Sequence, residues 1–376
     1  MGNQSKAVTL GVSGWRIHGR RTGVGRYLLN IVRHWQDHQP FSCVNFYSPQ
    51  VVDRSDIPLP AQLEPIVLLS AWPMLVWENL RLGPKIKDTV LFCPSFSRPL
   101  FTRSRTVVTS HDAVQQIHPE LFPISARLFY NHLYGWSARH ATLVITDSEA
   151  SREDVIRYWR VPREKTRVIY LAPADFVHRT RDREDLAEAQ RIVGTDNPFF
   201  LFVGKISGRR NIPCLLEAFA TFKKETGCPH VLVLCGLNPH RLQLNALLMK
   251  LKIVDSVRYC EYLPDRQVNL LYNAAEALVM PSVYETVSLP VVEAQAAGTP
   301  VICIGSSGMR EITGGAALFV DSLERGLLAA AMTEMSSDSA LRIRLSEAGL
   351  ENVKRFSWQR CAAETLKVLA EAAVLP

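Results

Sequence analysis

Several patterns that would assign a function directly are missing from this chain. The eight cysteines are scattered, with no Cys-x-x-Cys pair and no clustering with histidines, so neither a zinc site nor a disulfide framework is indicated. A reducing cytosol is the simplest compartment for such a protein. The full dinucleotide-binding fingerprint is absent, and there is no Asp-x-Asp pair of the kind that holds a metal.

Targeting and membrane-spanning segments are also not expected. The first six residues lack an apolar signal segment, and Lys6 stands where a myristoylation motif has Ser or Thr. No apolar run reaches transmembrane length, because the nearest candidate, residues 66–77, is broken by Ser70 and Pro73.

The length and charge of the chain limit what it can be. Its 376 residues exceed one ordinary hydrophobic core, so we expect two domains. The hydrophobic content of 47% and the charged content of 21% are typical of globular domains. The net charge of +7 favours an anionic partner, which could be a nucleotide diphosphate, a phospholipid surface or a nucleic acid.

Short apolar segments alternate with amphipathic helices in the N-terminal half, which predicts βαβ units and a mostly parallel sheet. Ser148 is a good N-cap for one of these helices. The expected strands are residues 7–12, 44–47, 66–69, 89–92, 106–109, 142–146 and 168–171. The expected helices are residues 74–82, 125–140 and 148–159.

A polar, charge-mixed segment, expected to be a linker with a short surface helix, precedes a second α/β rhythm. The expected strands are residues 199–203, 231–235, 257–261, 277–280 and 301–304, and the expected helices are residues 212–226, 239–251 and 265–275, the last capped by Asp265. Two Rossmann-like domains with a cleft between facing strand ends are therefore predicted. The predicted ranges are 1–174, a linker 175–197, 198–355, and a final helix 356–376.

Two features mark strand ends in the first domain. Gly23 and Gly25 lie between the first strand and its helix, beside the cationic Arg26. Glycines at such a position let the backbone approach a ligand closely, although a plain turn would explain them about equally well. His111 ends a strand, which suits a ligand cleft, whereas the alternative is a loop histidine next to an Asp112 that caps a turn.

In the second domain, a loop with two glycines and three cations follows the first strand at residues 204–211. Such cations can neutralise the developing charge of a diphosphate leaving group, whereas the alternative is a solvated basic loop. Two carboxylates follow a later strand: Glu285 in its loop and Glu293 in the helix that begins near Ser288. The N-terminus of that helix offers free N–H groups to an anion.

At these positions the chain resembles the family 4 retaining glycosyltransferases. The similar motifs are Pro281-Ser282-x-x-Glu285, Leu289-Pro290-x-x-Glu293-Ala294, Ala297-Gly298-x-Pro300 and Glu311-x-x-Gly314, together with Gly23-Val24-Gly25-Arg26, Trp77-Glu78-x-Leu80-Arg81, His111-Asp112, Arg209-Arg210-Asn211, Leu263-Pro264-Asp265 and Phe356-Ser357-Trp358. The resemblance implies the GT-B fold, an α/β architecture of two facing Rossmann-like domains whose C-terminal helix crosses back to the first.

The resemblance also implies roles for individual residues. Glu293 would hold the ribose of the donor nucleotide, Glu285 and His111 would face the donor sugar, and Lys205 and Arg210 would clamp the diphosphate. The remaining residues that the resemblance assigns to donor and nucleotide binding are Gly23, Gly25, Arg26, Gly204, Arg209, Leu263, Thr286, Val287, Ser288 and Leu289. Transfer would retain the anomeric configuration without a protein nucleophile, and the implied chemistry needs neither a metal ion nor a cofactor.

The chain departs from the family at Thr286-Val287-Ser288, where Gly-Phe-Gly is usual, and this puts the identity of the donor sugar in question. The His111-Asp112 and Arg209-Arg210-Asn211 variants resemble members that often use GDP-mannose, which is the preferred donor. The alternatives are a UDP-sugar donor, a non-catalytic nucleotide-binding subunit, and a GT-B phosphorylase or epimerase.

The resemblance implies a saccharide or a lipid-linked saccharide as the acceptor, in glycan or polysaccharide synthesis. A nucleic acid is not expected, because the cations gather in two strand-end loops rather than alternating with aromatic residues on one face. The expected location is the cytoplasm, with peripheral contact to the inner membrane face through Trp72 and Trp77 as a further hypothesis. The alternative is that Trp77 packs its helix on the sheet.

Overall fold

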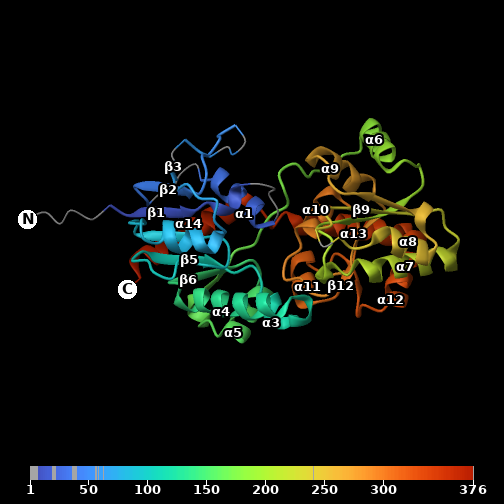
Figure 1. Ribbon diagram of the computed structural model, residues 1–376. Coiled ribbons are helices and arrows are strands. Elements are labelled where there is room, and N and C mark those ends of the chain that lie inside the picture. Colours follow the sequence, from blue (N-terminus) through green and yellow to red (C-terminus); the bar gives the residue numbers. More distant parts are fainter. Residues whose placement is uncertain are drawn as a thin grey trace, which may run out of the picture. The chain divides into compact units, whose positions relative to one another are not determined.

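Two separate parallel sheets, each covered by helices, form from the alternating segments (Figure 1). The first unit combines Met1–Leu171 with Phe356–Pro376, and the second comprises Ala172–Arg355. The computed structural model describes residues 7–18, 23–35, 40–55, 57, 59–61, 63–239 and 241–375. The predicted α/β class is confirmed. Residues 172–197, most of which were expected to be a linker, group with the second unit and contain a capped helix.

The sheet of the first unit has the strand order β3-β2-β1-β4-β5-β6-β7, and all pairings are parallel. The strands are β1 Thr9–Ser13, β2 Cys43–Ser48, β3 Leu63–Val67, β4 Val90–Cys93, β5 Arg105–Thr109, β6 Leu143–Thr146 and β7 Thr166–Val168. The central strands β4 and β6 are buried on both faces, as their continuous apolar sequence requires. The order reverses between β1 and β4.

The helices of the first unit follow these strands. They are α1 Gly23–Arg33, α2 Met74–Trp77, a π-helical turn η2 Glu78–Leu82, α3 Val114–Ile117, α4 Ile124–His140, α5 Glu149–Trp159 and α14 Trp358–Val374. Three short 3-10 turns are η1 Trp15–Ile17, η3 Pro119–Leu121 and η4 Arg163–Lys165. Ser148 caps α5 as predicted, since its hydroxyl accepts from the Ser151 N–H at 3.0 Å.

The last helix of the chain returns to the first unit, as the resemblance implied. The Trp35 indole donates to the carbonyl of Ala362 at 3.1 Å, and Arg105 donates to the carbonyl of Ala373 at 3.0 Å. Arg167 and Glu371 form an ion pair at the same helix. Helix α14 therefore completes the core of a domain whose other strands and helices all precede the second unit in the sequence.

The sheet of the second unit has the order β10-β9-β8-β11-β12-β13, again all parallel. The strands are β8 Phe199–Val203, β9 Val231–Cys235, β10 Val257–Cys260, β11 Ala277–Met280, β12 Val301–Ile304 and β13 Leu318–Val320. The helices are α6 Arg183–Val193, α7 Ile212–Thr226, α8 Leu244–Leu251, α9 Asp265–Ala274, α10 Leu289–Ala297, α11 Ser307–Thr313, α12 Arg325–Ser337 and α13 Ser339–Val353, with 3-10 turns η5 Gly208–Arg210 and η6 Val254–Ser256. The order reverses between β8 and β11, and such a switch point is where ligands bind in open α/β sheets.

Two helix predictions in the second unit were wrong in detail. The helix expected over residues 239–251 begins only at Leu244, because the Asn238 side chain both accepts from the N–H and donates to the carbonyl of Leu242, at 2.9 Å each, and holds a loop. Asp265 is the first residue of α9 and not its cap, which is Pro264. The carboxylate of Asp265 still lies in the first turn, where the helix dipole favours it.

Candidate functional site

A glycine turn opens the basic loop that follows β8. Gly204 has a φ of +142°, and Gly236, at the end of the neighbouring strand β9, has a φ of +148°. A Cβ atom on Gly236 would lie 2.1 Å from the carbonyl oxygen of Gly204, so the two turns touch backbone to backbone. Only glycine fits both positions, and the turn sets the direction in which the loop leaves the sheet.

The loop after β8 is tied to the loop after β11. Arg209 and Arg210 lie in the 3-10 turn η5, and the backbone N–H of Val283 donates to the carbonyl of Arg209 at 2.9 Å. The basic loop therefore meets the Glu285 loop at the β8/β11 switch point.

Glu285 lies at the centre of this cluster. Its side chain is 1% exposed, with Oε1 2.7 Å from Arg210 Nη1 and Oε2 3.2 Å from Arg209 Nη1. Burial lowers the pKa of Arg210, and the Glu285 carboxylate opposes that effect. Lys205 is exposed and makes no ion pair with a residue that the structure describes. The Glu285 carboxylate is therefore paired with two arginines, of which Arg210 is the more buried, and Lys205 lies exposed in the same loop.

The segment between Glu285 and α10 is tightly packed. Thr286 and Ser288 are buried, whereas Val287 and Leu289 are half-buried. The backbone of Gly308, in α11, lies against this segment so closely that a Cβ there would be 2.5 Å from the Glu285 carbonyl oxygen. The segment Thr286-Val287-Ser288 therefore lies where there is little free space.

Glu293 projects from the second turn of α10. Its side chain is buried, and Oε2 accepts a hydrogen bond from the Tyr272 hydroxyl of α9 at 2.9 Å. Ser288 occupies the N-cap of α10 and makes no side-chain cap, so the first N–H groups of this helix are not satisfied by that side chain. Leu263, in the loop before α9, packs against the core of the unit.

His111 occupies the tip of β5 in the first unit. Its Nδ1 lies 2.6 Å from Asp147 Oδ2, and its Nε2 lies 3.0 Å from the Pro94 carbonyl. Burial alone would lower the pKa of His111, but the Asp147 carboxylate and the hydrogen bonds outweigh it and raise the pKa. Asp112 accepts from the Val114 N–H at 3.2 Å, which is the turn cap that the sequence allowed as an alternative.

The glycines near the first strand are not in a loop. Gly23 and Gly25 form the first turn of α1, and Arg26 follows them in the same helix. The prediction of a glycine loop was wrong for these residues because the helix already begins at Gly23. Arg20 and Arg21 lie outside the described residues.

A second buried carboxylate, Glu78, lies at the β1/β4 switch point of the first unit. Ser97 donates to Glu78 Oε2 at 2.7 Å, and Ser13, the last residue of β1, donates to Oε1 at 3.4 Å. Burial raises the pKa of Glu78 to about 8, although the hydrogen bonds and the charge of Arg16 oppose this. The titratable groups Cys93 and Tyr134 also interact with it electrostatically.

The Glu78 carboxyl makes the stability of the protein depend on pH. Its pKa rises from 4.5 in the unfolded chain to about 8 in the fold, so its contribution is complete below pH 4.5 and is lost as the pH rises to about 8. Glu78→Gln keeps a neutral group at every pH. We expect the variant to gain stability relative to the parent across this interval, by up to about 1.4 kcal/mol per pH unit. Urea unfolding followed by tryptophan fluorescence measures it, and a difference that does not change with pH would contradict the raised pKa.

Several residues that contact Glu285, Glu293 and His111 were not predicted from the sequence. Tyr272 holds Glu293, Asp147 holds His111, and Gly236 and Gly308 shape the loops around Glu285. Asp147 and Gly236 each follow a strand directly, so their positions at strand tips were a usable signal. Tyr272 lies within a helix, and nothing in the local sequence marks it.

Trp77 is completely buried and donates to the Leu68 carbonyl at 2.9 Å, which confirms the alternative that it packs on the sheet. The hypothesis of membrane contact stays a prediction that rests on Trp72, which is half-exposed. Among the described residues, no helix is long and apolar enough to span a bilayer. The same residues contain no group of three or more His, Cys, Asp and Glu side chains suited to a metal ion.

Comparisons with known proteins identify a family for the chain. Residues 182–352 match the family described as Glycosyl transferases group 1, and residues 21–172 match Glycosyltransferase Family 4. The O-antigen chain mannosyltransferase B of Escherichia coli is 28% identical over 92% of this chain and 95% of its own. The O-antigen chain mannosyltransferase RfbU of Salmonella typhimurium is 25% identical over 65% of this chain and 64% of its own.

Solved structures share the fold at lower identity. A sucrose-phosphate synthase from Thermosynechococcus elongatus superposes with a TM-score of 0.77 at 19% identity, covering 97% of this chain and 99% of the other. Anabaena Alr3699/HepE, solved with UDP and glucose, gives a TM-score of 0.76 at 17% identity, covering 97% of this chain and all of the other.

Proposed function

The chain belongs to the family 4, or group 1, glycosyltransferases and has the GT-B fold, and from this we propose that it transfers mannose from GDP-mannose to a saccharide or lipid-linked saccharide, with retention of configuration. One observation carries the proposal: Arg209 and Arg210, in the loop that also carries Lys205, meet Glu285 where the order of the second sheet reverses.

The proposed roles follow from charge and depth. Lys205 is exposed, and the Arg209 side chain is 28% exposed, so both can reach the diphosphate of a donor. Arg210 lies deeper, where it positions Glu285 and adds positive charge beneath the leaving group. In the first turn of α10, Pro290 has no N–H and the Val291 N–H donates to the Ser288 carbonyl at 3.0 Å, so the Leu289 N–H is the donor that this helix would offer to the same anion.

Glu293 and Glu285 have separate proposed tasks. Glu293, fixed by Tyr272, would accept hydrogen bonds from the ribose hydroxyls of the nucleotide. Glu285, fixed by two guanidinium groups, would accept a hydrogen bond from the transferred sugar and stabilise positive charge that develops at its anomeric carbon. His111, oriented by Asp147, would contact the sugar from the first unit. The acceptor hydroxyl would attack on the face from which the nucleotide leaves, so no covalent intermediate with the protein forms.

Mannose as the transferred sugar is proposed from the relatives named as mannosyltransferases. A UDP-sugar is the second candidate donor, because a protein of the same fold was solved with UDP and glucose. The buried Thr286 and Ser288 are the residues we expect to affect this choice.

A donor screen by thermal unfolding tests the proposal. We expect GDP to raise the midpoint of the second unit, since a ligand at one hundred times its Kd stabilises a protein by about 2.7 kcal/mol. UDP should have a much smaller effect. Stabilisation by UDP alone would overturn GDP-mannose and favour the second candidate, whereas binding of GDP without any transfer to saccharide acceptors would favour a non-catalytic subunit.

A further inference from the structure

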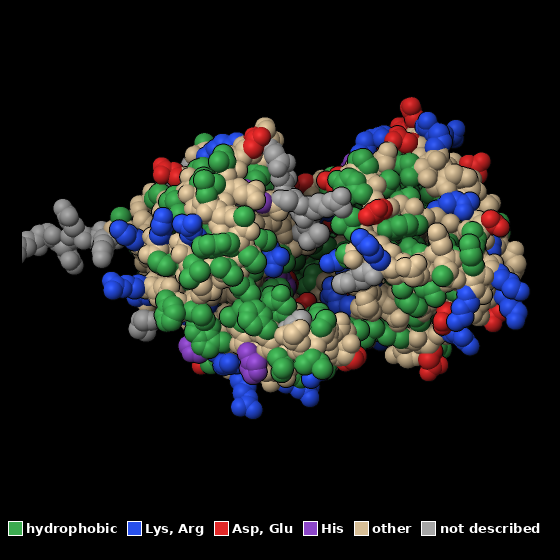
Figure 2. Space-filling model, viewed as in Figure 1, with side chains coloured by type: hydrophobic (Ala, Val, Ile, Leu, Met, Phe, Trp, Pro, Cys, Tyr) green, Lys and Arg blue, Asp and Glu red, His purple; other side chains and the backbone are tan. Residues whose placement is uncertain are grey.

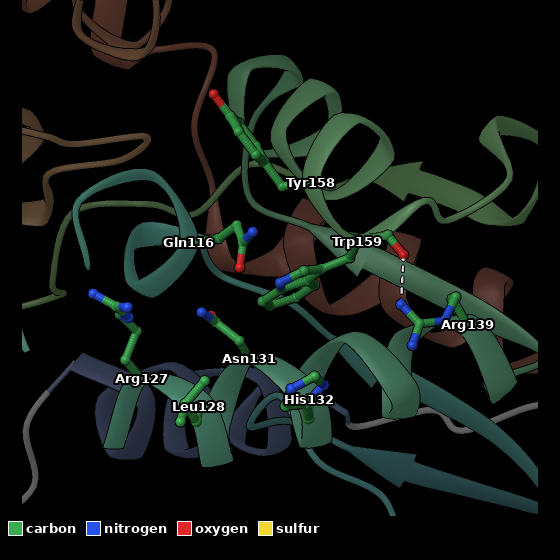
Figure 3. A pocket seen from close by; sticks show the side chains of 8 residues that line it. All are labelled: Gln116, Arg127, Leu128, Asn131, His132, Arg139, Tyr158 and Trp159. Atoms are coloured by element: carbon green, nitrogen blue, oxygen red, sulfur yellow. Dashed lines mark hydrogen bonds between the residues drawn. The ribbon is translucent and has the colours of Figure 1, made fainter. Parts of the chain in front are cut away.

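A cavity of about 400 Å³ lies between three helices of the first unit, apart from the strand-end clusters (Figure 3). It is lined by residues of α3, α4 and α5, namely Gln116, Arg127, Leu128, Asn131, His132, Arg139, Tyr158 and Trp159. Its volume falls within the range of cavities that hold small molecules. No role proposed for the glycosyl transfer uses any of these residues.

Two polar atoms in the wall of the cavity lack partners. Trp159 is 2% exposed, and its indole N–H finds no acceptor among the described residues. The Asn131 side-chain oxygen is also buried without a donor there. Figure 3 shows Gln116, Asn131 and the Trp159 ring pointing toward one another across the cavity. A buried polar group without a partner lowers the stability of the fold by about 1–3 kcal/mol. A ligand that supplies both an acceptor and a donor would therefore stabilise this wall.

The charge of the cavity is entirely positive. Arg127 and Arg139 lie at its edges, and none of the described residues that line it is acidic. Arg139 donates to the Trp159 carbonyl at 2.9 Å, which fixes the guanidinium against the backbone of Trp159. Arg127 is half-buried and pairs with no described carboxylate. A guanidinium in this state favours an anion with several oxygens, above all phosphate, which it can bind through two N–H groups.

We propose that this cavity is a binding site for a phosphate ester that carries hydroxyl groups. The phosphate accepts hydrogen bonds from Arg127 and from the Trp159 indole, and a hydroxyl group donates to the Asn131 oxygen. Leu128 and the rings of Tyr158 and Trp159 provide the apolar surface against which the carbon skeleton of the ligand packs.

This chemistry occurs both in free sugar phosphates and in the headgroups of anionic lipids. The outer surface of α4 is apolar beside the cavity, where Ile124, Leu128 and Phe129 are exposed. Figure 2 shows hydrophobic side chains gathered over the area that α4 occupies in Figure 1. The test therefore includes a soluble lipid as well as a sugar phosphate.

The indole N–H of Trp159 provides a direct readout by ¹⁵N–¹H NMR. All seven tryptophans lie in the first unit, and Trp159→Phe identifies the peak of interest. The probes are glucose 1-phosphate and dihexanoyl phosphatidylglycerol, with glucose as the neutral control. We expect at least one phosphate probe to shift the Trp159 peak to saturation while the peaks of the other tryptophans stay in place.

Arg127→Gln removes the proposed phosphate contact, and we expect it to weaken the apparent affinity at least 10-fold. The unchanged peaks of the other tryptophans show that this variant is folded. Arg344→Gln, at an exposed position inside a helix of the second unit, is the matched control and should bind like the parent. A shift with glucose 1-phosphate assigns the site to sugar phosphates, and a shift with the lipid alone assigns it to headgroups. No Trp159 shift up to about 10 mM of either probe, or equal affinity in Arg127→Gln, overturns the proposal.

Discussion

Replacing Arg210 with methionine is expected to lower the kcat for sugar transfer by about 10²- to 10³-fold, the usual cost of one preorganised charge stabiliser. Arg210 Nη1 lies 2.7 Å from Glu285 Oε1, 2.9 Å from Met280 Sδ, 3.4 Å from Ser282 Oγ and 3.5 Å from Ser288 Oγ. One side chain thus touches the end of β11, its loop and the cap of α10. Methionine retains the apolar stem but removes the charge.

The same change should destabilise the second unit. Glu285 would keep only Arg209 as an ion-pair partner among the described residues, and breaking a buried pair costs about 3–5 kcal/mol. Adding Glu285→Gln removes the unpaired charge, so the double variant should regain much of the stability and none of the activity. That contrast separates catalysis from folding.

Arg344→Met is the control for the loss of an arginine from the second unit, since Arg344 is exposed on α13. Circular dichroism measures stability, and product formation from labelled donor measures transfer. If Arg210→Met left kcat within about two-fold of the parent, the placement of Arg210 under the leaving group would be wrong.

Gly236→Ala is expected to cost about 3–5 kcal/mol of stability, at the upper end for a single substitution. The new Cβ would lie 2.1 Å from the Gly204 carbonyl oxygen and 2.6 Å from the Gly204 carbonyl carbon, both backbone atoms that have no rotamer to change. The φ of +148° adds strain for any residue with a side chain. Relief requires the turn after β8 to move, and that turn carries Lys205.

The control for this variant is Gly194→Ala. Gly194 also has a positive φ, +77°, but a Cβ there meets nothing within 4 Å. It ends α6, and we expect its replacement to cost about 1–2 kcal/mol from backbone strain alone. Equal destabilisation of the two variants would show that the clash of the new Cβ with the Gly204 backbone does not contribute to the loss of stability.

The distribution of tryptophan makes the measurement specific to one unit. Since all seven tryptophans belong to the first unit, tryptophan fluorescence does not report directly on unfolding of the second. Circular dichroism reports on both units. For Gly236→Ala we therefore expect an early transition in ellipticity that is weak in fluorescence.

The strands and the two glutamates of the second unit could be predicted because their signals are local. The apolar run of β11, the loop with Glu285 and the helix with Glu293 follow one another directly in the chain. The pairing of β8 with β11 is different, since three helices and two strands separate them. Periodicity does not determine which strands become neighbours, and the fold expected from the family supplied that step.

Other features depended on contacts between distant residues. The Asn238 side chain replaced the first turns of the expected helix with a loop, which overrode a favourable helical pattern. Tyr272 reaches Glu293 from another helix, so only the packing of α9 on α10 reveals it. The cavity beside Trp159 likewise requires three helices at once, and no segment of the sequence marks it.

The return of α14 to the first unit reverses the order in which the two domains can be completed during synthesis. Residues 172–355 leave the ribosome before Phe356–Pro376, so the second domain has its whole sequence while the first still lacks its last helix. Until then, the Trp35 indole has no Ala362 carbonyl to bind, and the surfaces of α1, β4 and β5 that α14 covers remain open. The nascent N-terminal domain is therefore the natural client for a chaperone, although it is translated first.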